Sequence, residues 1–123
     1  MTSMLEDDEV MSPVSTQEDD QSQVGYLYCM SNPVYEGIYK IGFTEKDPEK
    51  RRLQLSSTSV PLDFKIEFAK KVINFKSKEK LIHSILSGFD TRINPKREFF
   101  KVNIDIVHDI FKLIDGDWYQ ILL

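Results

Sequence analysis

The chain has 123 residues, enough for one domain and too few for two independent cores. Hydrophobic residues make up 41% and aromatic residues 11%, so a compact core is expected. No apolar run is long enough to span a membrane, and the amino terminus does not have the pattern of a secretory signal. The single cysteine, Cys29, excludes an internal disulfide framework and a zinc site built from cysteines. We therefore expect an intracellular protein that is not secreted, in the cytoplasm or nucleus of a cell or of a virus-infected host.

The charges are unevenly distributed along the chain. Residues 1–23 hold seven acids and no Lys or Arg, so all 16 bases lie in residues 24–123, against 13 acids. The whole chain carries −4, whereas residues 24–123 carry +3. Residues 1–23 are rich in polar and acidic residues and have no aromatic one, which predicts a disordered acidic tail. It either stays solvated or folds back on a basic surface, where it would compete with an anionic partner.

The first predicted elements form a hairpin. Residues 24–30 are apolar and aromatic and predict a buried strand. A turn signal at residues 31–33 and Gly37 close a loop of about seven residues. Residues 38–43 resume as a second strand, and the two strands are expected to pair antiparallel.

A helix, a strand and a second helix follow. Asp47 is expected to cap a helix that begins at Pro48 and runs to about Ser56. Alternation over residues 64–73 predicts the third strand. Ser77 is expected to cap a helix ending near Ser87 and Gly88, with one apolar face formed by Leu81, Ile82, Ile85 and Leu86.

The last third of the chain predicts a short strand and a final helix. Asn94 and Pro95 indicate a turn, and residues 97–102 an extended segment. Asn103 caps a helix that ends at Gly116, with Ile104, Val107, Ile110, Phe111 and Ile114 inward. Residues 118–123 are apolar enough to pack back onto the domain. The order β-β-α-β-α-β-α predicts a small α+β fold with a central antiparallel or mixed three-stranded sheet flanked by helices, plus a short extra strand.

Tyr28 and Lys40 are two candidate catalytic residues. If the hairpin centres on Val34, the two lie directly opposite, with Cβ atoms ~5 Å apart. A free tyrosine has a pKa of ~10. A neighbouring ammonium or a metal ion would favour the phenolate, which can serve as a base or a nucleophile. The structural alternative is a core aromatic residue beside a lysine that reaches the sheet edge.

Arg51 is a third candidate, on the helix that begins at Pro48. Arg51 and Leu55 are four residues apart and share a side of that helix. If Leu55 packs on the sheet, Arg51 reaches along the sheet's rim, where a planar guanidinium suits a phosphate. The alternative is a solvated basic face, because Lys50 and Arg52 flank Arg51.

The order and spacing of these residues resemble the GIY-YIG nuclease superfamily. Eleven residues separate Tyr26-Leu27-Tyr28 from Lys40-Ile41-Gly42, and Arg51 follows. The likeness extends to the branch named after a bacteriophage T5 open reading frame. Its motifs match residues 25–28, 40–44, 47–51 and 56–61, Glu79 with His83, and residues 97–100. The resemblance covers residues 24–102, with residues 103–123 as an accessory helix and tail of one nuclease domain, 24–123.

The resemblance implies metal-dependent hydrolysis of a DNA phosphodiester. Tyr28 would act on the attacking water or on the phosphorus, and Arg51 would neutralise charge on the phosphate. Lys40 stands where the superfamily has its second tyrosine, and would be the electrostatic partner of Tyr28. His83 is a further catalytic candidate, with a helix-edge structural role as its alternative.

The resemblance also implies a carboxylate that binds the metal, and two residues compete for that role. Glu79 shares an edge of its helix with His83, and Glu98 lies in the extended segment beside Arg97. One carboxylate, waters and a phosphate oxygen suit Mg²⁺ or Mn²⁺. The alternatives are an ion pair between Glu98 and a nearby base, and a solvent-facing Glu79.

DNA is the expected partner. Basic residues concentrate around residues 46–52, 70–80 and 92–101, and Lys46, Arg52 and Arg97 are the residues we expect to bind DNA. A domain this small has little surface for reading bases, so specificity would need a partner protein or a dimer. The alternative function is a nucleic-acid-binding or interaction module with weak or no cleavage. A structural protein that interacts through an exposed 118–123 segment is a third interpretation.

Overall fold

The computed structural model describes residues 23–57, 60–88 and 98–121. The described chain forms a five-stranded antiparallel sheet and three helices. The strand order is β5-β3-β2-β4-β6. The elements are β2 (Val24–Ser31), β3 (Ile38–Thr44), α2 (Pro48–Leu55), β4 (Lys65–Ile73), α3 (Phe75–Ser87), β5 (Phe99–Lys101), α4 (Ile104–Lys112) and β6 (Asp117–Trp118). This is the predicted α+β fold, with its three central strands antiparallel and a short strand added at each edge.

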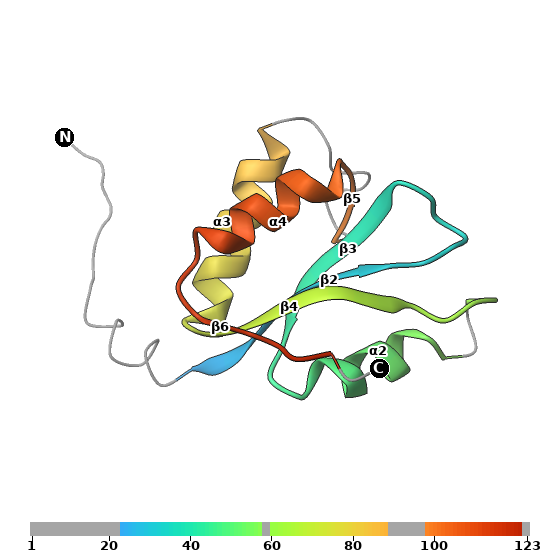
Figure 1. Cartoon of the computed structure of the whole chain (residues 1–123), viewed down its shortest axis with the longest axis horizontal. Helices are drawn as coiled ribbons and strands as arrows, with labels where there is room; N and C mark the ends of the chain where they lie inside the picture. The colour runs from blue at the N-terminus through green and yellow to red at the C-terminus, as the bar shows by residue number, and fades with distance from the viewer. Residues whose placement is uncertain (1–22, 58–59, 89–97, 122–123) are drawn as a thin grey trace.

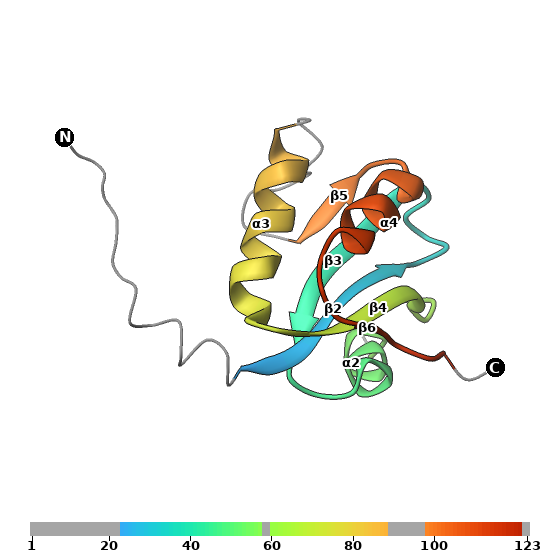
Figure 2. The ribbon, with the colours of Figure 1, turned by 60° about the vertical axis from the view of Figure 1, so that its left-hand side comes forward.

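The helices cover both faces of the sheet. Helices α3 and α4 lie over one face and α2 lies on the other (Figures 1 and 2). Because side chains alternate along a strand, β2 serves both cores. Leu27 and Cys29 face α3 and α4, whereas Tyr28 and Met30 belong to the cluster on the α2 face. Tyr28 therefore lies beneath the helix that carries Arg51.

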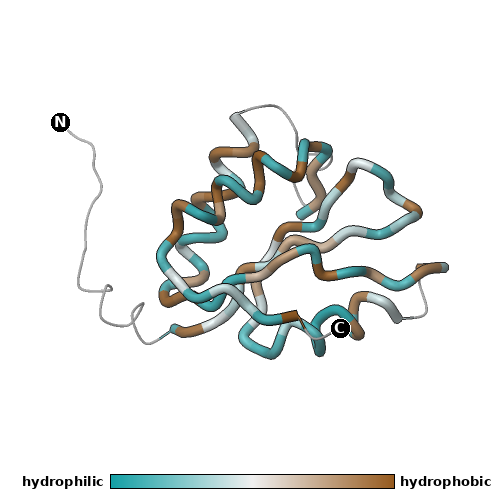
Figure 3. Tube along the Cα trace, in the orientation of Figure 1, coloured by the Kyte–Doolittle hydropathy of each residue, from teal (hydrophilic) through white to brown (hydrophobic). Residues whose placement is uncertain are grey.

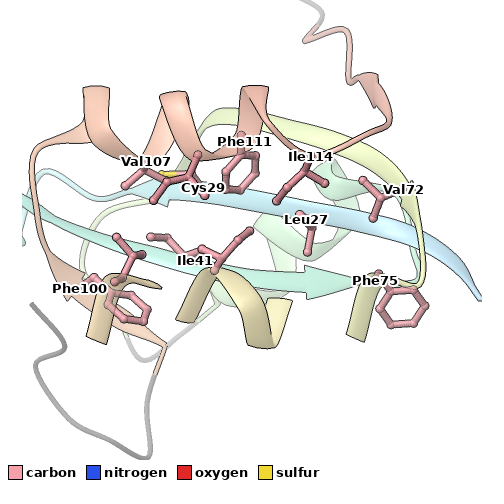
Figure 4. Packing of buried hydrophobic residues seen from close by; sticks show 12 residues of the cluster. Leu27, Cys29, Ile41, Val72, Phe75, Phe100, Val107, Phe111 and Ile114 are labelled. Atoms are coloured by element: carbon pink, nitrogen blue, oxygen red, sulfur yellow. The ribbon is translucent and has the colours of Figure 1, made fainter. Parts of the chain in front are cut away.

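The larger core lies between the sheet and the helices α3 and α4. Figure 4 shows Leu27 and Ile41 of the sheet surrounded by Phe75, Phe100, Phe111 and other apolar side chains from the helices and β5. These residues are almost fully buried. Helix α2 is the most hydrophilic of the three helices (Figure 3). Few of its apolar residues contact the sheet. One of them, Leu55, packs against the smaller core on the α2 face.

The hairpin register differs from the prediction. Strands β2 and β3 pair antiparallel as expected, but Tyr28 lies opposite Gly42, and Lys40 lies opposite Met30. The loop contains two successive turns, in which Tyr35 N–H donates to Asn32 O and Ile38 N–H donates to Tyr35 O. These turns centre the hairpin on Tyr35 instead of Val34. When the centre of a hairpin shifts by one residue, each residue pairs with a partner two positions further along the other strand. Lys40 therefore stays on the same face of the sheet but is no longer opposite Tyr28.

One predicted helix start is wrong, and one predicted capping residue makes no capping hydrogen bond. Helix α3 begins at Phe75, two residues before Ser77, because Asn74 adopts a left-handed conformation at its amino terminus. The apolar face then passes through Phe75, Ile82 and Leu86, while Leu81 and Ile85 are exposed. Asp47 precedes α2 as predicted, but its side chain makes no capping hydrogen bond.

The final helix matches its predicted start and ends early. The Asn103 side chain accepts a hydrogen bond from Asp105 N–H, as a capping residue does, and the helix stops at Lys112, ahead of Gly116. The predicted packing of the carboxyl-terminal segment is confirmed for two residues. Trp118 pairs with Lys70 in the sheet, and Tyr119 packs edge-on against Tyr26.

Lys70, which the sequence placed in a basic surface cluster, is buried on the α4 face of the sheet. Its ammonium donates to the Phe111 carbonyl at 2.8 Å and to the Ile114 carbonyl. The ammonium also lies over the Trp118 ring. A cation at the carboxyl end of a helix satisfies its free carbonyls and complements its dipole. Lys70 therefore holds the end of α4 to the sheet and does not contribute to an open basic surface.

Some predictions concern residues outside the described part of the chain. They include the tail up to residue 22, the turn at Asn94 and Pro95, and residues 122–123. Within the described ranges, no helix has the length and apolar character needed to cross a membrane.

Candidate functional site

The site is built around Tyr28, whose side chain is fully buried on the α2 face of the sheet. Its hydroxyl oxygen has no hydrogen-bond partner of good geometry among the described residues. Gly42, the residue opposite on β3, has no side chain to fill the space beside that hydroxyl. A Cβ added to Gly42 would collide with Glu98 Oε1 and stand 2.8 Å from the Tyr28 hydroxyl oxygen. The glycine therefore allows a phenol and a carboxylate to approach each other.

Glu98 reaches this point from the start of β5. Its carbonyl accepts a hydrogen bond from Ile41 N–H at 2.9 Å, which fixes its backbone to β3. Its carboxylate forms an ion pair with Lys40, with 3.3 Å between Nζ and Oε1. The lysine ammonium also lies 5.2 Å from the centre of the Phe99 ring. Lys40 thus contacts Glu98, and the register places it away from Tyr28.

Arg51 approaches Tyr28 from α2. One end of its guanidinium donates to Gln54 Oε1 at 3.3 Å, within the same helix. Its Nε is buried and, like the Tyr28 hydroxyl, lacks a hydrogen-bond partner among the described residues. One such atom therefore comes from β2 and one from α2, and the Arg51 guanidinium acts on the Tyr28 hydroxyl. Such atoms are costly in a folded protein and commonly mark a place where a ligand or water binds.

Burial dominates the ionisation of Tyr28. Removal from water raises the pKa of its hydroxyl to about 12, against an ordinary value of 10.0. A polar contact with the Arg51 guanidinium, and its positive charge, lower this pKa, whereas the charges of Glu98 and Glu79 raise it. The prediction that an ammonium stabilises the phenolate therefore fails for Lys40, and the cation that acts on Tyr28 is Arg51.

Glu79 and His83, on α3, lie near the same site. They are close to the part of β3 that does not pair with β5. His83 Nε2 lies 2.8 Å from the Ile41 carbonyl oxygen. Because a carbonyl only accepts, Nε2 carries the proton in this contact. Glu79 Oε2 lies 3.8 Å from the same nitrogen, and both side chains are nearly buried. The prediction that these two residues share one edge of their helix is confirmed.

The comparison with protein families assigns the chain to a family. The family model of the T5orf172 domain matches residues 25–115, which is most of the chain. The chain belongs to the T5orf172 domain family. No curated protein and no solved structure matches the chain. Family membership confirms the resemblance to the bacteriophage T5 branch and indicates a nuclease-like or nucleic-acid-interacting domain.

The expected DNA-binding residues of this T5orf172 domain occupy different environments. Arg52 forms a bidentate ion pair with Glu49 and donates to the Phe64 carbonyl, so its guanidinium already has protein partners. Lys46 is exposed in the loop before α2, where its backbone N–H donates to Thr44 Oγ1. Arg97 lies outside the described residues.

The described carboxylates of the T5orf172 domain do not form a metal cage made of protein ligands alone. In the described ranges, no group of three or more His, Cys, Asp or Glu side chains is arranged to hold a metal ion. Glu98 and Glu79 both raise the pKa of Tyr28, so both carboxylates lie near enough to act on its hydroxyl. Carboxylates are donors that suit a hard cation whose other ligands are water and phosphate oxygens.

Sequence reasoning missed the importance of Gly42. The motif Lys40-Ile41-Gly42 was recognised, but the role of its glycine depends on the hairpin register. With the register centred on Tyr35, a glycine opposite a buried tyrosine signals close approach of other groups.

Proposed function

We propose that this domain is a metal-dependent DNA endonuclease that hydrolyses phosphodiester bonds. The observation that carries the proposal is the approach of the Tyr28 hydroxyl and the Glu98 carboxylate at Gly42, with the Arg51 guanidinium acting on Tyr28. Family membership and the unpaired polar atoms of Tyr28 and Arg51 support it. A phenol, a fixed cation and a carboxylate around a space without a side chain are suited to binding and cutting a phosphodiester.

Arg51 provides the fixed positive charge in this proposal. A guanidinium binds phosphate oxygens in a planar, two-point geometry and is always charged. Charge accumulates on the phosphate as the attacking oxygen approaches, so a cation already in place stabilises the transition state more than the ground state. The buried Nε of Arg51 leaves part of its hydrogen-bonding capacity for the substrate.

Tyr28 handles or orients the attacking water. With a pKa of about 12, its hydroxyl is neutral in almost every molecule near pH 7. A neutral hydroxyl can accept a hydrogen bond from the attacking water and so orient it. Acting as a full base requires further positive charge, to which Arg51 contributes.

Mg²⁺ or Mn²⁺ is the proposed cofactor, and Glu98 and Glu79 are the residues that would hold it. The bound cation would supply Lewis-acid stabilisation of phosphate oxygens and a more acidic water. His83 donates to the Ile41 carbonyl and lies beside Glu79, so we assign it to positioning Glu79. Lys46 and Arg97 would bind the DNA backbone outside the site, and Arg52 would do so only by exchanging its contact with Glu49.

Nicking of supercoiled plasmid in Mg²⁺ or Mn²⁺ tests the proposal. Tyr28→Phe removes one hydroxyl and should lower nicking by about a hundredfold, and Arg51→Ala by about a hundredfold to a thousandfold. Tyr26→Phe on the same strand and Lys50→Ala on the same helix are matched controls that should retain activity. Undiminished nicking in Tyr28→Phe would reject the assigned chemistry.

The second candidate function is a nucleic-acid-binding module that does not cut. The observation that favours it is the raised pKa of Tyr28, together with the pairing of Lys40 to Glu98 instead of to the phenol. Salt-sensitive DNA binding by the wild type, with no nicking in either metal, would select this function.

A further inference from the structure

Lys40 is separated from Tyr28 by the register of the hairpin. It lies opposite Met30 on one side and Phe99 on the other, in the middle of three strands. Its side chain is only 12% exposed, so it has little freedom to leave this position. The groups that Lys40 contacts here therefore indicate what its ammonium does.

The group that Lys40 contacts is the Glu98 carboxylate, at 3.3 Å. The Phe99 ring lies beneath the ammonium and limits its movement to the side. The backbone of Glu98 is fixed by Ile41 N–H. Glu98 is therefore held at two points, by β3 through its carbonyl and by Lys40 through its carboxylate, although its side chain is 31% exposed.

The place where Glu98 is held is chemically specific. Its Oε1 lies over Gly42, where a Cβ would also contact the Tyr28 hydroxyl. Both Glu98 and Glu79 raise the pKa of Tyr28, so two carboxylates act on one buried phenol. The Lys40 ammonium offsets one of these two negative charges and allows Glu98 to stay in this position.

We propose that Lys40 acts as a positioning residue that holds the Glu98 carboxylate over Gly42, and that it does not act on Tyr28 or on the phosphate directly. This inference rests on the proposed nuclease function for its effect on cleavage. Lys40 stands where the superfamily has its second tyrosine. In this role it handles no proton and instead supports the Glu98 carboxylate beside the phosphodiester to be cut.

A double-mutant cycle tests which partner Lys40 acts through. Lys40→Met should lower plasmid nicking in Mn²⁺ by about tenfold to a hundredfold, the range expected when the support of a ligand is removed. Lys40→Arg should restore most of the activity. In a Glu98→Gln background, or in Glu98→Asp if Gln abolishes nicking, adding Lys40→Met should cause little further loss. Lys101→Met, which removes the charge of an exposed lysine on β5, is the control for weaker DNA attraction.

A second readout does not depend on cleavage. Tyrosine labelled with ¹³C at the ring carbon that bears the hydroxyl reports the surroundings of Tyr28 at neutral pH, and the Tyr28→Phe spectrum assigns its signal. In the Glu98→Gln background, Lys40→Met should leave the Tyr28 signal unchanged. In the wild-type background, the same substitution releases the Glu98 carboxylate and should shift the Tyr28 signal. Circular dichroism checks that each variant is folded.

Each result separates the inference from the proposed function. A further tenfold loss on adding Lys40→Met to the Glu98 variants, or a shifted Tyr28 signal in the Glu98→Gln background, would overturn the role of Lys40. Absence of nicking in the wild type would reject the nuclease, and the Tyr28 signal at neutral pH would still decide whether Lys40 acts through Glu98.

Discussion

Tyr28 lies directly opposite Gly42 in the ladder between β2 and β3, and the missing side chain of the glycine provides the space in which Glu98 approaches the phenol. A residue with no side chain is thus as much a part of the site as the charged residues around it. A single methyl group added at Gly42 would therefore disturb the site.

Gly42→Ala should reduce nicking by about a hundredfold, because one added carbon displaces Glu98 or the buried Tyr28 ring from the site. We expect the free energy of unfolding to fall by about 1–3 kcal/mol, as in other overpacked cores. Gly37→Ala is the control: it strains a backbone with φ of 76°, but no atom lies within 4 Å of its Cβ position. If Gly42→Ala nicks as fast as the wild type, the glycine does not shape the site.

The pH dependence of cleavage follows from the ionisation of Tyr28. Its pKa of about 12 means that the phenolate fraction rises about tenfold for each pH unit through the neutral and mildly alkaline range. If the phenolate is the active form, the logarithm of the nicking rate rises with pH with a slope near one. Rates measured from about pH 7 to pH 10, at saturating Mg²⁺, provide the test. A flat profile would mean that Tyr28 acts as a neutral hydroxyl.

The stability of the fold should fall in alkali for the same reason. The folded state keeps the Tyr28 proton up to a pKa of about 12, whereas an unfolded tyrosine loses it near pH 10. The contribution of Tyr28 to stability is therefore complete below pH 10 and is lost as the pH rises towards 12. Thermal unfolding followed across this interval should show a smaller decline for Tyr28→Phe. Tyr119, whose pKa is also raised to about 12 by burial and by its hydrogen bond to Asp47, accounts for part of the remaining decline.

Lys70→Met should destabilise the protein by about 1.5–3 kcal/mol, because it leaves the Phe111 and Ile114 carbonyls without their charged donor. Lys71, its exposed neighbour on the same strand, is the matched control, and Lys71→Met should change stability by less than about 0.5 kcal/mol. Chemical denaturation gives both values. Equal effects of the two substitutions would show that the buried contacts of Lys70 contribute nothing specific.

Local patterns predicted most of the fold. The alternation in β4, the capping residue Asn103 and the apolar face of α4 are properties of neighbouring residues, and all three agree with the structure. The hairpin register and the start of α3 were not predictable in the same way. They depend on how the loop around Tyr35 forms its turns and on the left-handed conformation of Asn74, which no short pattern specifies.

The candidate site was likewise predictable only in part. Motif order grouped Tyr28 and Arg51 with one carboxylate, and it left open whether that carboxylate is Glu79 or Glu98. It assigned Lys40 to the wrong partner, because that assignment depended on a register centred one residue too early. The burial of Lys70 was also hidden, since a lysine in an alternating strand looks like a surface residue until the end of a helix is known to pack over it.

Strand β6 covers part of the edge of β4. Asp117 and Trp118 pair with β4 at Lys71 and Lys70, whereas the family match stops at residue 115. A chain shortened to that residue would leave this part of β4 with unpaired backbone groups, which are a template for pairing with another molecule. We expect the shortened protein to self-associate at concentrations where the full chain stays dispersed, as light scattering would reveal. Asp117 and Trp118 are thus expected to protect this edge of the sheet against aggregation.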